Sequence, residues 1–410
     1  MNYPIPEILA PAGDEERLQS AVEYGAHAVY LGSDRFGMRT AAASFGGDSL
    51  KNACEYAHKN GVKVYLTCNT VLGNAEIDML PAFLEYASDS GVDALIVTDL
   101  GVMSTVKKIL PGMEIHISTQ AGVTNYATAN MLYDLGAKRI VTARELSLDE
   151  IAQIRAKVPK ELEIECFVHG AMCVSFSGRC LLSNYMTGRD SNRGDCAQPC
   201  RWNYALQEEK RPGEFFPVEQ DGTGTYILNS KDMCMIDHIP ELYAAGVNSF
   251  KIEGRAKSAY YTAVAVNAYR SALDGFVASG FSPDYKIEDW MRREVYKASN
   301  RQYCTGFFFS SPMDNAEIYY DGGYVRQWDV AAVAREWKDG VLYATQRNRF
   351  FEGDELEAML KGKAPLTIKV TGLKNGEGES VTNAPHPMME LSFDCPVPVP
   401  AGSYLRKKRD

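Results

Sequence analysis

The sequence has no long apolar segment. None of its hydrophobic runs approaches the roughly 20 residues that a helix needs to cross a lipid bilayer. Residues 1–13 also lack the basic segment followed by an apolar one that marks a secretory signal. The sequence therefore predicts a cytoplasmic protein that makes no contact with a membrane.

An excess of positive charge is also missing, because the formal net charge of the 410 residues is −10. Bulk electrostatics therefore give no help to nucleic-acid binding, and any contact with RNA would need a local basic patch. Hydrophobic residues make up 45% of the chain and charged residues 23%, which is typical of a packed globular protein rather than a disordered one. The length allows one domain of about 250 residues and a second of about 100.

The sequence contains no HExxH motif, the usual zinc-binding pattern of metalloproteases. It does contain ten cysteines. In a reducing cytosol these are not expected to form five disulfides. Six of them lie between Cys166 and Cys234, and such clustering points to metal or redox chemistry.

About the first 275 residues repeat one pattern of a short apolar strand, a polar turn and an amphipathic helix. Many of the helical stretches end at a glycine just before the next strand, as in NGVKVYL and SGVDALIV. Strands that alternate with helices form a parallel sheet, and this number of units in about 250 residues predicts an α/β fold, a TIM-like (β/α) barrel. The predicted strands, one more than a barrel of eight needs, are Glu7–Ala10, Ala28–Gly32, Lys63–Asn69, Ala94–Asp99, Glu114–Gln120, Arg139–Glu145, Glu163–His169, Tyr226–Lys231 and Phe250–Glu253.

The barrel pattern is interrupted between residues 170 and 224 by a segment rich in cysteine, glycine and arginine. Such an insertion after a barrel strand lies where active-site loops lie. We expect the barrel to span residues 1–285, a helical linker residues 286–320, and a small C-terminal β-barrel domain residues 321–410. The terminal YLRKKRD could touch phosphates, but a solvated, fraying end is the favoured interpretation.

Polar side chains alternate with apolar ones along three of the predicted strands. Each of these strands would then carry polar residues on one face near its C-terminal end, although a parallel barrel strand is normally apolar on both faces. Any one of these residues could be a structural hydrogen-bond partner, but together they predict a polar barrel mouth. The three sets are His116, Ser118 and Gln120; Glu163, Glu165 and His169; and Lys251, Glu253 and Arg255.

Five cysteines in and after the insertion have spacings that suit a metal site. Six residues separate Cys173 from Cys180, three separate Cys196 from Cys200, and 33 separate Cys200 from Cys234. This is looser than the paired knuckles of zinc ribbons and is not a ferredoxin run, so an iron–sulfur cluster is favoured slightly over zinc. Buried structural thiols are the alternative to a metal site.

The stretch ECFVHGAMCVSFSGRCLLS resembles the signature of the collagenase-like, U-type peptidase family. EILAPAG, HISTQ, CRWNY, NSKDMC and FKIEGRAKS are similar to further motifs of the same family, so the resemblance covers nearly the whole chain. Despite the family name, its better-understood members are oxygen-independent hydroxylases. The resemblance implies 5-hydroxylation of the wobble uridine of tRNA, with prephenate, a small carboxylate, as the oxygen source.

The resemblance also implies that four cysteines hold a [4Fe–4S] cluster. Carried over by position, the ligands are Cys173, Cys180, Cys196 and Cys234. The C-x3-C spacing of Cys196 and Cys200 leaves open that Cys200 replaces one of them. Such chemistry also requires an electron donor, which no motif indicates.

On this hypothesis, residues at the strand ends and around the cysteines take part in acid–base chemistry or bind the substrate. The predicted acid–base or orienting residues are His169, Lys231 and Glu253. The predicted substrate-binding residues are His116, Gln120, Glu165, Arg179 and Arg255. Phosphates or the carboxylates of the co-substrate could also be neutralised by arginines near the cysteines, although each could equally be a surface residue. These are Arg189, Arg193 and Arg201.

Two other functions are compatible with the sequence. One is a peptidase, in which Cys166 or Cys173 would act as a nucleophile with His169. Cys166 and His169 are three residues apart on one strand and would point to opposite faces, which disfavours that pair. The other is a non-catalytic, cluster-bearing factor that binds RNA through its C-terminal domain.

Overall fold

The centre of the molecule is a closed barrel of parallel strands. The computed structural model describes residues 3–37, 45–173, 175–202, 219–221, 224–226, 231–309 and 324–409. The barrel strands are β1 (Glu7–Pro11), β2 (Ala28–Gly32), β3 (Lys63–Cys68), β4 (Ala94–Val97), β5 (Glu114–Ile117), β6 (Arg139–Val141), β7 (Glu163–Ala171) and β11 (Ser249–Ile252). Each pairs in parallel with the next, and β11 pairs with both β7 and β1, which closes the ring. The predicted TIM-like barrel is confirmed.

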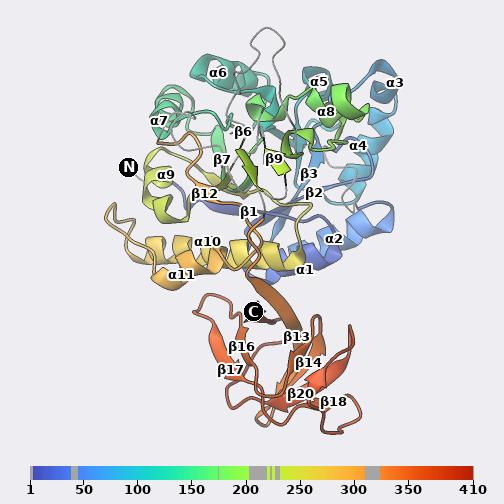
Figure 1. The fold of residues 1–410 in the computed structure, drawn as a ribbon. Coiled ribbons are helices and arrows are strands. Elements are labelled where there is room, and N and C mark those ends of the chain that lie inside the picture. The colour runs from blue at the N-terminus through green and yellow to red at the C-terminus, as the bar shows by residue number, and fades with distance from the viewer. Residues whose placement is uncertain are drawn as a thin grey trace, which may run out of the picture.

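Helices follow most of the strands and surround the barrel (Figure 1). Local sequence explains where several begin: the Asp14 and Ser258 side chains accept backbone hydrogen bonds in the first turn, and Ser147 forms a capping box with Glu150. Within the described ranges, no helix is long and apolar enough to cross a membrane. The helices are α1 (Glu15–Glu23), α2 (Asp48–Lys59), α3 (Asn74–Ile77), α4 (Leu80–Asp89), α5 (Leu100–Ile109), α6 (Tyr126–Asp134), α7 (Leu148–Lys157), α9 (Ile239–Ala244), α10 (Ala259–Ala278) and α11 (Asp289–Val295).

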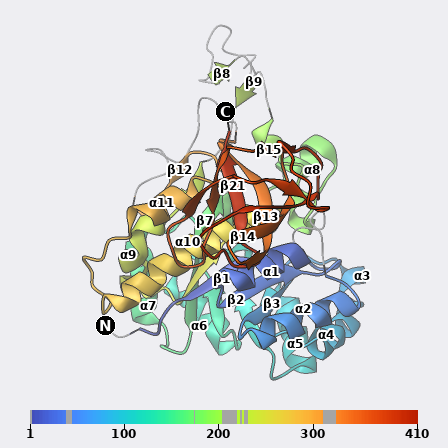
Figure 2. The same cartoon turned by 90° about the horizontal axis from the view of Figure 1, so that it is seen from below.

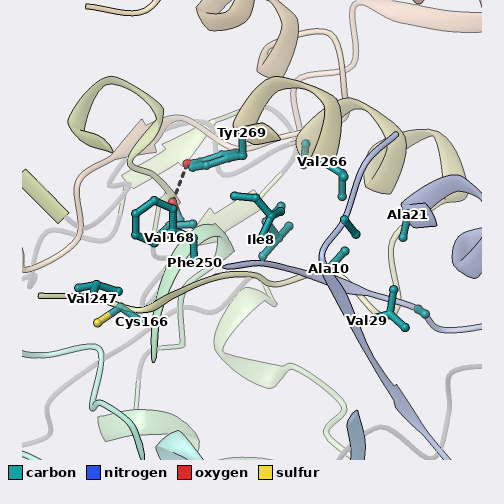
Figure 3. Packing of buried hydrophobic residues seen from close by; sticks show 14 of the residues in the cluster. Ile8, Ala10, Ala21, Val29, Cys166, Val168, Val247, Phe250, Val266 and Tyr269 are labelled. Atoms are coloured by element: carbon teal, nitrogen blue, oxygen red, sulfur yellow. Dashed lines mark hydrogen bonds between the residues drawn. The ribbon is translucent and has the colours of Figure 1, made fainter. Parts of the chain in front are cut away.

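Two layers of side chains follow from the alternation of the strands. Outward-facing residues such as Ile8, Val29, Val168 and Phe250 belong to the main apolar core, where α10 contributes Val266 (Figure 3). Inside the barrel, β1 to β4 form a smaller apolar cluster of Leu9, Ala28, Tyr30, Tyr65, Ala94 and Ile96. The other barrel strands send polar and charged side chains inward, and these support the site described below.

Because β7 and β11 pair directly and close the ring of eight, Tyr226–Lys231 is the surplus one of the nine predicted strands. Its middle lies outside the described residues, and Tyr226 ends β9 (Gly224–Tyr226), which pairs with β8 (Glu219–Asp221). The next strand, β10 (Asp232–Cys234), runs antiparallel to the end of β7 and pairs at its other edge with β12 (Tyr303–Cys304). The eighth barrel strand is therefore β11, and β10 extends the sheet beside the barrel mouth.

Between β7 and Trp202, the described part of the Cys-rich insertion consists of short helical turns. These are η2 (Phe176–Gly178), α8 (Leu182–Thr187), η3 (Ser191–Arg193) and η4 (Pro199–Arg201). In Figure 2, α8 lies at the same end of the barrel as the β8–β9 hairpin. Because the segment follows the carboxyl end of β7, it covers the end of the barrel where active sites of this fold lie.

The C-terminal part of the chain forms an antiparallel sheet, in the region where the sequence predicts a small β-barrel domain. Its strands are β13 (Trp328–Lys338), β14 (Val341–Gln346), β16 (Glu355–Ala358), β17 (Leu366–Lys369), β18 (Lys374–Asn375), β20 (Glu390–Asp394) and β21 (Tyr404–Lys408). They pair in the order β17, β16, β21, β13, β14, β20 and β18. A separate pair consists of β15 (Phe350–Phe351) and β19 (Asn383–Ala384). Figure 1 shows this domain against the side of the barrel formed by α1 and α10.

The helix α10 packs against both domains. Fifteen of its 20 residues are buried, because it lies between the barrel and the C-terminal domain. The Asn267 side chain donates to the Leu360 carbonyl (3.0 Å) and accepts from the Gly362 N–H (2.9 Å). Met359 and Tyr404, both from the C-terminal domain, belong to the apolar core of the barrel. Two apolar side chains of the C-terminal domain therefore pack into the barrel core, while the rest of that domain has an apolar core of its own.

Arg406 lies at the centre of the contact between the domains. Its guanidinium is fully buried and binds both oxygens of Glu294 on α11, at 2.6 and 2.7 Å. It also lies 3.0 Å from Glu357 and 3.1 Å from the Tyr260 hydroxyl. The interpretation of YLRKKRD as a fraying end is therefore wrong, because residues 404–408 form β21 between β13 and β16. Since carboxylates surround Arg406, it is not available to a phosphate.

We expect Arg406→Ala to lower the free energy of unfolding by about 3–5 kcal/mol, because it leaves Glu294 buried without its partner. Denaturation with guanidinium chloride measures the loss. Arg409→Ala is the matched control, since Arg409 is exposed and pairs with Asp329 at the surface, where an ion pair contributes at most about 1 kcal/mol. Equal losses in the two variants would contradict a role for Arg406 in holding the domains together.

Candidate functional site

A cavity of about 190 Å³ lies at the C-terminal ends of the barrel strands. Its floor is formed by strand residues that point into the lumen, namely Tyr30, Thr67, Ile96, Phe167 and Lys251. Its walls come from the loops after the strands, with Asn69, Ser118, Gln120, Arg144, Glu253 and Arg255. The Cys-rich segment provides its roof. Polar side chains from distant parts of the sequence thus meet at the barrel mouth.

Four cysteines line the roof of this cavity: Cys173, Cys180, Cys196 and Cys200. The backbone N–H of Leu182 lies 3.3 Å from Cys180 Sγ, and that of Gln198 lies 3.4 Å from Cys196 Sγ. In both pairs the donor comes two residues after the cysteine. Hydrogen bonds to sulfur stabilise negative charge there, which is what a metal-bound thiolate carries.

Contacts with three loops hold the Cys-rich segment over the barrel mouth. The Ser177 hydroxyl donates to Glu145 in the loop after β6 (2.7 Å), and the Val71 N–H in the loop after β3 donates to the Asn192 carbonyl (3.4 Å). Arg179 Nε donates to the backbone carbonyl of Gln120 after β5 (2.6 Å). Arg179, predicted to bind substrate, is not among the residues that line the cavity, and its contact fixes the roof.

The donor types around the cavity fit an iron–sulfur cluster. Thiolates are soft ligands, and three of the predicted ligands, Cys173, Cys180 and Cys196, lie together in the roof. In the described part of the chain, no three histidine, cysteine, aspartate or glutamate side chains are grouped closely enough to hold a metal ion. The thiols are thus gathered at one cavity, and they would have to close around a cluster to bind it.

The fourth predicted ligand, Cys234, is not among the residues that line the cavity. It lies on β10 opposite His169, with its sulfur 3.8 Å from the Tyr269 hydroxyl. Burial raises the pKa of its thiol to about 12. In its place the structure brings Cys200 to the cavity, an arrangement that the C-x3-C spacing left open.

A chain of buried charges lies under the cavity. Lys251 Nζ donates to Glu165 (2.6 Å), and Arg139 Nη1 contacts both Glu165 (3.0 Å) and Glu7 (2.7 Å). Burial by itself would raise the pKa of the Glu165 carboxyl, but the charges of Lys251 and Arg139 outweigh it and hold this pKa at about 2. The Lys251 amine is thereby held at the cavity floor, 4.7 Å from the centre of the Tyr30 ring.

The sequence predicts that Glu165 and His116 bind substrate, but both lie below the cavity. Each side chain is only 1% exposed. The two oxygens of Glu165 bind the cations of the buried network, and the His116 ring packs edge-on against Tyr65 with 4.6 Å between ring centres. Burial lowers the pKa of the His116 imidazole. The alternation in KIEGR predicts Lys251 on a polar face of its strand. Of the charged residues under the cavity, Lys251 is the one that lines it.

Three other predicted residues do line the cavity: Gln120, Glu253 and Arg255. Gln120 Oε1 accepts a hydrogen bond from Asn69 Nδ2 (3.4 Å), and Arg255 Nη1 donates to the Thr67 hydroxyl (3.2 Å). These contacts orient an amide and a guanidinium at the wall without filling the cavity.

Arg144 is a residue of the cavity that the sequence did not reveal. Its guanidinium lies 3.8 Å above the Phe167 ring, and Nη1 donates to the Ala171 carbonyl (2.8 Å). The sequence places it inside the predicted strand Arg139–Glu145, but β6 ends at Val141 and Arg144 lies in the loop that follows. With Lys251 and Arg255 it makes three cations among the lining residues, against the one carboxylate of Glu253. Such a lining suits an anionic ligand.

His169 does not face the lumen, contrary to the prediction. The pairing of β7 with β11 shifts register between Phe167 and His169, so Phe167 lines the cavity while His169 turns outward. The imidazole lies among Tyr261, Tyr269 and Tyr303, with ring centres 5.3–5.8 Å away. Burial lowers its pKa to about 4, so His169 is neutral at pH 7.

Two further predicted groups lie away from the cavity. Lys231 precedes β10 rather than ending a barrel strand, and it is not among the lining residues. Cys166 faces the outer core, 3.2 Å from the Thr142 hydroxyl, and burial raises the pKa of its thiol to about 12. It is therefore no nucleophile at neutral pH. The side chain of Arg201 lies outside the described part of the chain.

The Glu165 carboxyl makes the stability of the barrel depend on pH. Its pKa of about 2 in the folded state lies below the value of about 4.3 in an unfolded chain. The contribution is therefore present above about pH 4.3 and is lost as the pH falls toward 2. We expect Glu165→Gln to be less stable at pH 7 and to lose less additional stability on acidification than wild type. Thermal melts at a series of pH values measure both effects.

Glu85→Gln, at an exposed position on α4, is the control for removing one carboxylate. Its melting temperature should change with pH in the same way as that of wild type. A Glu165→Gln protein whose stability falls with pH as steeply as that of wild type would contradict the ion-pair assignment.

The sequence matches two family models. Residues 13–317 match peptidase family U32, and residues 326–406 match the C-terminal domain of the same family. The chain is 34% identical to tRNA hydroxylation protein P1 of Bacillus subtilis, over 98% of this chain and 94% of the relative. It is 36% identical to tRNA hydroxylation protein P of Escherichia coli, over 93% and 91%.

Two other matches cover less of the chain. A 23S rRNA 5-hydroxycytidine synthase of Escherichia coli is 38% identical over 66% of this chain and 40% of the relative. A solved U32 peptidase is 14% identical, with a TM-score of 0.41, over 62% of this chain and 95% of that structure. Since the first family model alone covers more than half of the sequence, the chain belongs to peptidase family U32.

Proposed function

We propose that this chain is an RNA-modifying hydroxylase that acts on C5 of the wobble uridine of tRNA without molecular oxygen. Two relatives that match 98% and 93% of the chain are named for tRNA hydroxylation, and a third is named for hydroxycytidine in rRNA. The structural observation that carries the proposal is the cavity, in which four thiols meet three cationic side chains at a barrel mouth.

We assign Cys173, Cys180 and Cys196 as ligands of a [4Fe–4S] cluster. Family resemblance supports Cys234 as the fourth ligand, whereas the cavity lining supports Cys200. Such a cluster supplies one-electron redox chemistry when bound. The chain's own part is to gather the thiols over the substrate cavity and to direct the N–H groups of Leu182 and Gln198 at two of the sulfurs.

The cationic lining supports a small carboxylate such as prephenate as the oxygen source. Lys251 is presented at the floor by Glu165, and Arg144 and Arg255 present guanidinium groups at the walls. Ion pairs between guanidinium and carboxylate groups are directional, and they strengthen where water is excluded. Glu253 at the same mouth is the remaining candidate for acid–base work.

A uridine can enter this cavity only if it leaves its stack. Unpaired bases in an RNA loop can do so at low cost, whereas a paired base must first be flipped. The side-chain amides of Asn69 and Gln120 at the wall offer both donors and acceptors, which suits the edge of a uracil ring.

The test begins with iron and sulfide analysis of protein purified without oxygen. We expect about four irons per chain in wild type. Cys173→Ala, Cys180→Ala and Cys196→Ala should lose the cluster. Cys54→Ala, which removes a buried thiol of α2 far from the cavity, should keep it. Comparison of Cys200→Ala with Cys234→Ala then identifies the fourth ligand, because only one of them should lose iron.

The same preparations are then incubated with unmodified tRNA, prephenate and a reductant. Mass spectrometry of the nucleosides should detect 5-hydroxyuridine with wild type and not with the iron-free variants. Iron-free wild-type protein that cleaves a peptide substrate would overturn the proposal and favour a peptidase. Cluster-loaded protein that binds tRNA without modifying it would favour a non-catalytic RNA-binding factor.

A further inference from the structure

The Cys-rich segment exposes an unusual number of large apolar side chains. We call the following five residues the rim, with the exposed fraction of each: Phe176 (52%), Leu181 (75%), Tyr185 (88%), Met186 (43%) and Trp202 (42%). All lie within one stretch of 27 residues. Exposed apolar groups gathered in one place mark an interaction surface, because each loses favourable burial while it faces water.

The rim lies beside the lining of the cavity along the chain. Its residues alternate along the chain with residues that line the cavity: Ser177 follows Phe176, Leu182 follows Leu181, and Cys200 lies two residues before Trp202. A group that rests on the rim is therefore next to whatever occupies the cavity. The helix α8, which carries Tyr185, stands at this end of the barrel (Figure 2).

The charge of this segment differs from that of the whole chain. Residues 175–202 contain four arginines and two aspartates, with no lysine or glutamate, although the net charge of the chain is −10. The Arg189 side chain is 46% exposed and pairs with Asp195 at 2.7 Å. Arg193 is 48% exposed and pairs with Glu76. Exposed pairs of this kind contribute little, so both guanidinium groups can exchange their carboxylates for phosphates at low cost.

We propose that the rim is the platform on which unpaired nucleotides of the RNA substrate stack, with Arg189 and Arg193 neutralising the phosphates between them. This rests on the proposed function and identifies the surface that receives the loop around the target base. Exposed aromatic rings beside arginines are what single-stranded nucleic acid requires, because every base offers a flat face and every linkage a negative charge. The Arg406 of the C-terminal tail, which is fully buried, cannot supply this surface.

The test measures binding rather than hydroxylation. Full-length, cluster-loaded protein is titrated into a fluorescently labelled anticodon stem-loop, and fluorescence anisotropy gives the dissociation constant. Tyr185→Ala should weaken binding about 5- to 150-fold, the range for loss of one stacked base. Tyr185→Phe keeps the ring and should bind as wild type does. Tyr343→Ala removes a tyrosine of the C-terminal domain that is 43% exposed, and it should have no effect.

Salt dependence tests the arginines separately. Each of Arg189→Gln and Arg193→Gln should reduce the slope of log affinity against log salt concentration by about 0.7, the value for one single-stranded phosphate contact. Unchanged slopes would overturn their role. A Tyr185→Phe protein that binds as weakly as Tyr185→Ala would overturn stacking.

The two proposals fail in different ways. If wild type binds and hydroxylates RNA while Tyr185→Ala, Phe176→Ala and Trp202→Ala all bind as tightly as wild type, the rim proposal alone is wrong. The same holds if only Tyr343→Ala weakens binding, because the C-terminal domain would then be the RNA surface. If cluster-loaded wild type neither binds nor modifies the RNA, the proposed function is wrong. Because the five rim side chains are exposed, their replacement should leave the melting temperature unchanged.

Discussion

The ion pair between Lys251 and Glu165 determines what the barrel can contain. A barrel of this kind is normally filled by layers of branched apolar side chains. Here part of the lumen is filled by charges, and these can remain buried only because each has a partner: Glu165 binds both Lys251 and Arg139, and Arg139 also binds Glu7. The apolar side of the lumen, from β1 to β4, needs no such pairing. The cavity begins where this charged layer ends, with one amine at its floor.

The site has two parts with different mechanical support. The floor belongs to barrel strands, whose backbone hydrogen bonds and buried pairs fix the side chains in place. The roof consists of short turns held to the loops by a few contacts, such as Ser177 with Glu145 and Arg179 with the Gln120 carbonyl. A roof of this kind can adjust around a bound group while the floor keeps its geometry. This division suits the proposed site, in which the thiols would close on a cluster and a base would enter from outside.

Much of the fold could be predicted because the chain repeats one unit, with glycine stops before strands and apolar alternation within them. The errors arose where tertiary contacts override a local pattern. A strand read with an unbroken period of two places His169 in the lumen, but the register shift after Phe167 turns it outward. The charges of the C-terminal tail suggest solvent, yet carboxylates from α11 and β16 bury Arg406. Arg144 belongs to the cavity through a loop conformation that no sequence period encodes.

The predicted ligands show the same limit. The family resemblance, carried over by position, names Cys173, Cys180 and Cys196 as ligands, and the structure brings these three thiols to one cavity. The sequence left Cys200 and Cys234 open as the fourth ligand, and the position of Cys234 depends on how β10 pairs with β7, a contact between residues more than 60 positions apart.

The shared helix α10 has a consequence for how the protein melts. Its residues are buried by both domains at once, and Met359 and Tyr404 of the C-terminal domain complete the interior of the barrel. Loss of either domain would therefore expose apolar side chains of the other to water. Domains joined in this way are not expected to unfold independently, and we expect the chain to melt as one cooperative unit with a single transition, despite its two distinct architectures.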